Sequence, residues 1–373
     1  MANSSKIKIL HITQVAGGIE TYIEQIFNNI DREKFELILA SPTDRQSLTK
    51  LASRYNVPHY PLALKWHISP VYDLLRIFSI IKLVKVIKPD IIHAHSSKAG
   101  MITRLAGVFF SAPILYTPNA FAYLGSNGIK KKLLILVEKM AIPFTNTLLA
   151  SSKSEALRSL NDLAFSAKKV KVYPNSIEIL PIEDKPSTSS SKKTITTVGR
   201  LVYQKNPMMF LNVCKILSDK RNDIMFQIIG AGFEDTLRKE IEGYIKENHL
   251  EKKINIIQWM DRPTLLKTIE NTDVFVMTSA FESFGYVAAE AQMLEIPVVA
   301  TDVDGLNEIV ENDVTGYLIE PNNAEKMAEK IELLVDNPQQ AKEMGKKGRA
   351  RVSKLFDIKN NIKILEEFYI KLK

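Results

Sequence analysis

Short apolar runs alternate along the chain with longer amphipathic stretches, and this alternation predicts a repeating strand and helix structure. The runs are rich in β-branched and aliphatic residues, as buried strands of parallel sheets are. In the first half of the chain they cover residues 6–13, 35–41, 57–62, 89–95, 112–118, 146–152 and 169–175. Predicted helices between them include residues 19–30 and 69–87. In the second half the runs cover residues 194–200, 225–230, 254–259, 273–279, 296–302 and 315–321.

A segment rich in proline, serine and charge interrupts this alternation at residues 181–193, where we place a linker. The length of 373 residues supports a division because it exceeds what one hydrophobic core usually holds. We therefore expect two doubly wound, Rossmann-like α/β domains, residues 1–180 and 181–356. Ligands bind such sheets beyond the carboxyl ends of the strands. We therefore expect the ligand-binding and catalytic residues in the loops that follow the strands, in a cleft between the domains.

Composition and charge indicate the kind of protein and the compartment in which it works. The single cysteine, Cys214, excludes an internal disulfide and lies in an apolar pattern typical of a packed core. The N-terminus lacks a signal-peptide pattern, and no apolar stretch reaches about 18 residues, so we expect a soluble cytoplasmic protein. The net charge of +8 is uneven: residues 1–180 carry a net +11 and residues 181–373 a net −3. The basic excess is therefore N-terminal.

Two post-strand loops carry groups suited to phosphate. Gly17 and Gly18 follow the first strand and open a helix, whose free N–H groups attract anions. A tight turn is an equal explanation for these glycines alone. Gly199, Arg200 and Lys205 follow the first strand of the second half, where two cations can grip a diphosphate without a metal. The alternative for that pair is a solvated surface position.

The loop and helix after residue 279 carry two carboxylates, Glu282 and Glu290. We expect Ser283 to cap the helix, so that the backbone N–H groups near Phe284 and Gly285 face a ligand. Glu290 lies seven residues beyond that cap, ~10 Å along the helix axis, so the two acids are too far apart to act on one bond as a paired acid and base. An elongated ligand fits better, with Glu290 accepting from a ribose diol and Glu282 from sugar hydroxyls. The alternative is that both acids lie on the surface, where the helix dipole favours a negative charge near the helix start. That alternative explains Glu282 but not Glu290, which lies inside an apolar run.

These segments resemble the family-four retaining glycosyltransferases of the GT-B fold. The resemblance rests on residues 198–207, 228–241 and 279–321 in the second half. In the first half it rests on residues 17–23, 90–100, 116–123 and 173–179, which occur in the family's order. It implies a nucleotide-diphosphate-sugar donor, with UDP expected, held mainly by the C-terminal domain. It also implies an acceptor held by the N-terminal domain, no metal or cofactor, and a last helix, about 357–373, that packs back on the N-terminal domain.

The resemblance also assigns residues. Arg200 and Lys205 match the diphosphate-binding pair that stabilises the leaving group, Glu290 the ribose acid, Glu282 the sugar-contacting acid, and Gly17 or Gly18 the phosphate-loop glycine. The nucleobase would lie near Met260 or Trp259, with burial of Trp259 as the alternative. Asn119 replaces the family's usual histidine in residues 116–121. Asn119 stays a candidate for the catalytic site and its acceptor side, because an amide can bind a sugar hydroxyl or the leaving oxygen. An amide cannot take a proton at neutral pH, so general-base catalysis at Asn119 is not expected.

Two further pairs invite a functional interpretation. Asp302 and Asp304 form an Asp-x-Asp pattern that holds a metal in another glycosyltransferase fold, a role we do not expect here. His93 and His95 lie at a strand end, and we expect them to point to opposite faces. His95 is then the candidate for the acceptor side of the cleft, and His93 a packing residue.

The N-terminal basic excess suggests a membrane surface. Lys130, Lys131 and Lys132 directly precede an aliphatic run, and residues 69–87 interleave basic and aliphatic residues. Ordinary amphipathic helices are the simplest explanation, with the apolar face of 69–87 covering the sheet. A lipid-linked glycan acceptor would instead favour contact with an anionic leaflet. We thus expect a hexosyl- or N-acetylhexosaminyltransferase of lipopolysaccharide, capsule or other surface glycan assembly, peripheral at the cytoplasmic membrane face, with no nucleic acid partner.

Three alternatives stay open from the sequence. A sugar-nucleotide epimerase can share this fold, and a non-catalytic nucleotide-sugar-binding protein can keep the same donor contacts. A dinucleotide oxidoreductase fits the tandem sheets but needs a third glycine that residues 230–235 lack.

Overall fold

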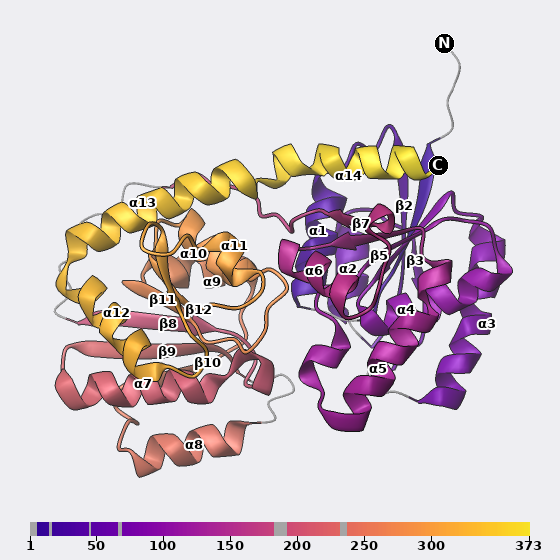
Figure 1. Ribbon diagram of the computed structural model, residues 1–373. Coiled ribbons are helices and arrows are strands. Elements are labelled where there is room, and N and C mark those ends of the chain that lie inside the picture. Colours follow the sequence, from indigo (N-terminus) through magenta and orange to yellow (C-terminus); the bar gives the residue numbers. More distant parts are fainter. Residues whose placement is uncertain (1–5, 15–16, 45, 66–68, 183–191, 232–236) are drawn as a thin grey trace. The chain divides into compact units, whose positions relative to one another are not determined.

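The computed structural model describes residues 6–14, 17–44, 46–65, 69–182, 192–231 and 237–373 (Figure 1). Most of the predicted linker, residues 183–191, lies outside the described residues. The chain divides into two compact units. Unit 1 combines Met1–Glu178 with Ile358–Lys373, and unit 2 is Ile179–Asp357.

Unit 1 is built on a parallel sheet of seven strands in the order β3-β2-β1-β4-β5-β6-β7. The strands are β1 (Ile7–Ile12), β2 (Phe35–Ser41), β3 (His59–Pro61), β4 (Ile91–His95), β5 (Ile114–Thr117), β6 (Thr147–Ala150) and β7 (Val170–Val172). The chain starts in the middle of the sheet, winds to one edge, and returns to β4 on the other side of β1. The β1 and β4 ends thus form the switch point of a doubly wound sheet, where ligands commonly bind.

Helices cover this sheet. They are α1 (Gly18–Asn29), α2 (Gln46–Arg54), α3 (Pro70–Ile87), α4 (Ser97–Ala106), α5 (Gly128–Met140), α6 (Lys153–Asn161) and α14 (Ile358–Leu372). Short 3₁₀ turns occur at η1 (Gly107–Phe109), η2 (Ala122–Gly125), η3 (Ile142–Phe144) and η4 (Ala167–Lys169). The two helices named from the sequence are present as α1 and α3. The core joins strand residues such as Leu10 and Ile92 to Ile80 and Val84 of α3 and Ile102 of α4.

The last helix, α14, belongs to unit 1 and packs against α1. Leu365 and Tyr369 on α14 are completely buried. The Tyr369 hydroxyl lies 2.7 Å from Nδ1 of His93 in β4. The backbone N–H of Ile358 donates to the carbonyl of Ile177 at 3.0 Å. The last helix of the chain is therefore a structural part of unit 1.

Unit 2 repeats the architecture with six parallel strands in the order β10-β9-β8-β11-β12-β13. The strands are β8 (Lys193–Val198), β9 (Ile224–Ala231), β10 (Ile254–Gln258), β11 (Val274–Met277), β12 (Val298–Thr301) and β13 (Gly316–Ile319). The helices are η5 (Tyr203–Lys205), α7 (Pro207–Lys220), α8 (Arg238–Glu247), α9 (Arg262–Glu270), α10 (Tyr286–Met293), α11 (Leu306–Ile309), α12 (Ala324–Asp336) and α13 (Pro338–Leu355). Cys214 of α7 is completely buried in the core of unit 2, as predicted. The switch point here lies between β8 and β11.

The Tyr369 hydroxyl provides a test of how α14 is held. In Tyr369→Phe, Nδ1 of the buried His93 loses its partner, so we expect unit 1 to lose about 1–3 kcal/mol of unfolding free energy. Urea unfolding followed by circular dichroism measures the change. The control is Tyr203→Phe, because Tyr203 is 68% exposed. Equal stability of Tyr369→Phe and the native chain would show that the hydroxyl does not anchor the helix.

Candidate functional site

The ends of β8 and β11 bring two chemically rich loops of unit 2 together, because these strands are parallel neighbours. A cavity at this position is lined by Gly199, Arg200 and Lys205 from the first loop and by Thr278 and Ser279 from the second. The Thr278 hydroxyl lies 3.0 Å from the Lys205 carbonyl oxygen, to which it donates. A Cβ at Gly199 would lie 3.0 Å from Cγ of Lys205, so a larger residue would crowd the lysine. The two predicted cations therefore line one cavity.

Lys205 forms an ion pair with Glu282, which follows β11. The lysine side chain is 22% exposed and the glutamate side chain 11%, so this pair is largely shielded from water. The backbone at Glu282 is held as well: its N–H donates to Asp304 Oδ2 at 3.3 Å, and its carbonyl accepts from the Gly305 N–H at 2.9 Å. The pairing was not predicted from the sequence, where the two residues are 77 positions apart.

The turn into α10 differs from the expectation for Ser283. The residue before the helix is Gly285, at φ +100°, and no side chain caps the helix there. The predicted cap at Ser283 is wrong because the chain needs a left-handed residue at the turn, which glycine adopts without strain. A Cβ at Gly285 would also lie 2.6 Å from the Leu306 side chain. Phe284 is 1% exposed and packs edge-on against Phe356, so its side chain is part of the core.

Glu290 lies on α10 and is 2% exposed. Its partner is Arg262, the first residue of α9, whose Nη2 is 2.5 Å from Glu290 Oε1. Although the charges are close, Oε1 accepts no hydrogen bond of suitable geometry from the described residues. Burial raises the pKa of the Glu290 carboxyl, and the Arg262 charge opposes this shift. Arg262 was missed from the sequence, although a cation in the first turn of a helix is unfavourable and therefore informative.

The loop after β10 carries the two residues expected near a nucleobase. Trp259 is 57% exposed, so the alternative that it is buried in the core is wrong. It follows the edge strand of the sheet, where helices cover less surface. Met260 is half-buried, and its sulfur accepts from the Thr268 hydroxyl at 3.7 Å. Both residues stay predictions as nucleobase contacts.

Unit 1 contains the other predicted loops. Gly17 takes a positive φ of +83° and Gly18 begins α1, while the preceding residues 15–16 lie outside the described residues. After β5, Asn119 and Ala120 take positive φ values of 51° and 76°. Such angles are strained for alanine and often mark functional loops. Asn119 Oδ1 accepts from Asn175 Nδ2 at 3.2 Å, which fixes the orientation of the Asn119 amide.

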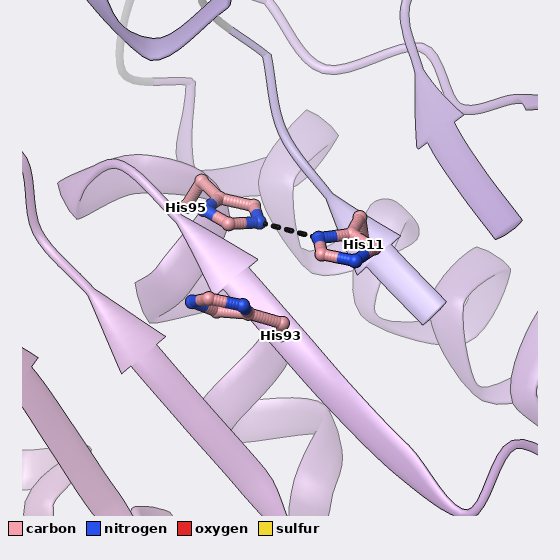
Figure 2. Close-up of side chains that lie close together, drawn as sticks. All are labelled: His11, His93 and His95. Atoms are coloured by element: carbon pink, nitrogen blue, oxygen red, sulfur yellow. Dashed lines mark hydrogen bonds between the residues drawn. The ribbon is translucent and has the colours of Figure 1, made fainter. Parts of the chain in front are cut away.

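His95 lies in a cluster with His11 and His93, and all three are completely buried (Figure 2). The His93 and His95 rings have centroids 4.0 Å apart. The expected opposite orientation of these two residues is wrong, because residues two apart on a strand point to the same face. His11 joins them because it is directly opposite His93 in the β1–β4 register. His95 does not face open solvent here, and its contact with an acceptor stays a prediction.

Burial keeps this cluster in neutral form, and hydrogen bonds connect its members. His11 Nδ1 is 3.0 Å from His95 Nε2. His93 uses both ring nitrogens, toward Tyr369 at 2.7 Å and toward Thr117 Oγ1 at 2.8 Å. Burial and then the Arg32 charge lower the pKa of His11 to about 3. Burial is also the main cause of the lowered pKa values of His93 and His95.

The same cluster has the composition of a metal site, since its nitrogens lie within 4.8 Å of one another. Its chemistry fits a cation poorly. The group contains no carboxylate to balance a buried positive charge, and His93 has no ring nitrogen that is not already hydrogen-bonded. We therefore interpret the cluster as a neutral hydrogen-bonded network.

Asp302 and Asp304 have separate environments. Asp302 is exposed and its backbone N–H donates to the Ile319 carbonyl at 2.7 Å. Asp304 takes a φ of 40° and accepts from the backbone of Glu282. Asp304 therefore supports the Glu282 loop.

Family comparisons agree with this arrangement. The family described as Glycosyltransferase Family 4 matches residues 16–179, and Glycosyl transferases group 1 matches residues 181–351. The two matches together cover most of the chain, so the protein belongs to the family-four glycosyltransferases, as the sequence motifs predicted.

Individual relatives align over nearly the whole length. The chain is 27% identical to the UDP-Gal:alpha-D-GlcNAc-diphosphoundecaprenol alpha-1,3-galactosyltransferase of Escherichia coli, covering 98% of this chain and 97% of that protein. It is 26% identical to the capsular polysaccharide biosynthesis glycosyltransferase CapM of Staphylococcus aureus, covering 97% and 96%. The crystal structure of Anabaena HepE in complex with UDP and glucose matches with a TM-score of 0.84 at 20% identity, over 98% of this chain and 100% of that chain. This likeness confirms the GT-B fold.

The histidine cluster predicts an acid-sensitive unit 1. In the unfolded chain His11 takes up a proton near pH 6.5, whereas in the folded chain its pKa is about 3. The contribution of neutral His11 to the free energy of unfolding is fully present above pH 6.5. Below that value it is lost at about 1.4 kcal/mol per pH unit, because the unfolded chain binds a proton that the folded chain does not. We expect urea unfolding of His11→Gln to depend less steeply on pH between 6.5 and about 4. His249→Gln is the control, because His249 is exposed. An unchanged slope in His11→Gln would contradict the assignment.

Proposed function

We propose that the protein is a retaining glycosyltransferase that transfers a hexose or N-acetylhexosamine from a UDP-sugar to a lipid-linked glycan, in surface-polysaccharide assembly. The observation that carries this proposal is the shared position of Arg200, Lys205 and Glu282 at the switch point of unit 2. A cation pair beside an acid suits a ligand that has a diphosphate at one end and sugar hydroxyls at the other.

Each group has a defined role in the donor complex. Lys205 exchanges its contact with Glu282 for the diphosphate, and Arg200 adds a second charge-assisted bond. Glu282, released from the lysine, accepts from hydroxyls of the transferred sugar. Glu290 binds the ribose diol from its buried position on α10. The backbone near Gly285 and the loop at Gly17 and Gly18 supply N–H groups for phosphate oxygens.

The chemistry follows from these charges. Arg200 and Lys205 stabilise the negative charge that grows on the departing UDP, an electrostatic role that requires no metal ion. Asn119 holds a hydroxyl through its amide but cannot accept the proton. The departing phosphate oxygen takes the proton of the acceptor hydroxyl as the new bond forms on the same face of the sugar. That path gives retention of the anomeric configuration.

The relatives support the choice of donor and acceptor. The Escherichia coli relative is named for a UDP-linked galactose and a diphosphoundecaprenol acceptor, and CapM for capsular polysaccharide. HepE was crystallised with UDP and glucose. These names favour a UDP-sugar and a lipid-linked glycan over an epimerase or a non-catalytic binding protein.

Mutation of the donor site tests the proposal. Glu290→Gln and Arg200→Ala each remove a charged partner of UDP, so we expect UDP affinity to fall by about 1–3 kcal/mol in titration calorimetry. Lys239→Ala is the control, because Lys239 is exposed on α8. UDP affinities that match the native chain in both site variants would remove this cavity as the donor site.

A lipid-linked acceptor requires access to a membrane, and unit 1 has a suitable surface. Along α3, exposed apolar residues occur at helical spacing: Val71, Leu74, Leu75 and Phe78 are 76%, 56%, 52% and 60% exposed. The expectation that the apolar face of this helix covers the sheet holds only for its second half, where Ile80, Val84 and Ile87 are buried. The first half presents its apolar stripe to solvent.

A second stripe lies on α5, where the exposed apolar residues are Ile129, Leu133, Leu136 and Met140. Both helices contact α4, and Figure 1 shows α4 between them. The three successive lysines of α5, residues 130–132, are exposed. None of the helices that the structure describes is long and apolar enough to span a bilayer. We propose that these stripes enter the interface of an anionic cytoplasmic leaflet while the lysines contact its headgroups.

Vesicle co-sedimentation tests this surface. Each lysine near an anionic leaflet contributes about 1 kcal/mol, so Lys130, Lys131 and Lys132 all changed to Glu should abolish pelleting with anionic vesicles at low salt. The matched control changes Lys342, Lys346 and Lys347 of α13, which are exposed in unit 2, to Glu. A native chain that stays in the supernatant, or a triple α5 variant that pellets like it, would favour a soluble acceptor.

A further inference from the structure

Arg262 occupies a position that its own helix disfavours. It is the first residue of α9, directly after the cap residue Asp261, whose Oδ1 accepts from the Thr264 N–H at 3.0 Å. The helix dipole repels a cation in the first turn. The Arg262 side chain is 31% exposed and reaches across to the buried Glu290 on α10. The interaction with Glu290 therefore provides the reason for this placement.

Other charges near α10 have other partners or face solvent. Strands β11 and β12 carry no charged residue. On α13, Arg349 donates to the carbonyl oxygens of Leu180 and Met293. Arg351 pairs with Glu311. The remaining charged residues of α13 are exposed. On α11, the charged residue is Glu308, which is half-buried and negative, so it cannot act as the counter-charge of Glu290.

On α9 itself, Lys267 is exposed and Glu270 is half-buried. Among the described residues, Arg262 is the group whose charge acts on the Glu290 carboxyl. In the part of the chain that the structure describes, no second cation is placed to replace it there.

We propose that Arg262 is a positioning residue for the nucleotide ribose, which keeps the Glu290 carboxylate ionised and oriented for the ribose diol. This inference rests on the proposed ribose role of Glu290. A buried carboxylate without a counter-charge tends to take up a proton, and a protonated acid accepts fewer hydrogen bonds. Each carboxylate oxygen can accept more than one hydrogen bond. Arg262 can therefore stay at Oε1 while the two ribose hydroxyls bind.

The experiment isolates the ribose hydroxyls. The affinities of UDP and 2′,3′-dideoxy-UDP are measured by titration calorimetry, and their ratio is compared at about pH 6 and pH 8. Both ligands carry the same base and diphosphate, so proton uptake by those groups cancels in the ratio. The variants are Arg262→Gln and Arg262→Lys, with Lys267→Gln as a charge-matched control on the same helix.

For the native chain and the control we expect a preference for UDP that is nearly independent of pH. For Arg262→Gln we expect that preference to fall about tenfold at pH 6 and to recover toward pH 8, because the carboxyl then ionises without help. Arg262→Lys should retain most of the native preference at both values, because it keeps the charge.

Two outcomes overturn the inference alone. A native-like ratio in Arg262→Gln at both pH values would show that Arg262 does not act through Glu290. A higher ratio than native would show that Arg262 competes with the ribose. If the native chain itself does not distinguish the two ligands, the proposed ribose contact of Glu290 fails, and the inference fails with it.

Discussion

The ion pair between Lys205 and Glu282 is the interaction on which the candidate donor site depends. It exists because β8 and β11 are parallel neighbours, so their post-strand loops meet at the switch point of unit 2. The backbone around it is constrained at both ends, by the crowding at Gly199 and by the left-handed turn at Gly285. A shielded pair of this kind is costly to break unless another anion replaces the carboxylate. A diphosphate with an attached sugar provides both replacements, a phosphate for the lysine and hydroxyls for the glutamate.

Much of the fold could be predicted from the sequence, because each buried strand is a short apolar run between amphipathic helices. Each predicted run overlaps a strand of the observed sheets. The position of Arg200, Lys205 and Glu282 followed from the rule that ligands bind at strand ends. The sequence pattern does not show which side chains of different loops contact one another. For that reason the contact of Lys205 with Glu282, and the role of Arg262, became visible only in three dimensions.

The errors have physical causes as well. Ser283 is a good capping residue by type, but the turn requires a positive φ that only Gly285 adopts without strain. Trp259 follows an edge strand, and apolar character alone does not reveal which strand lies at an edge. The first half of α3 was expected to pack on the sheet, yet its apolar residues extend beyond the core. That surplus of exposed apolar surface on unit 1 is what a membrane-associated acceptor domain would use.

We propose that unit 2 binds a nucleotide-diphosphate-sugar through fixed charges and backbone groups without a metal ion. The most direct test is thermal unfolding of the full chain with a panel of nucleotide sugars, in buffer that contains EDTA, because a ligand that binds the folded state raises the unfolding temperature. We expect a rise with UDP and with at least one UDP-sugar. No rise with any nucleotide sugar in EDTA, followed by a rise when manganese is added in excess, would contradict it.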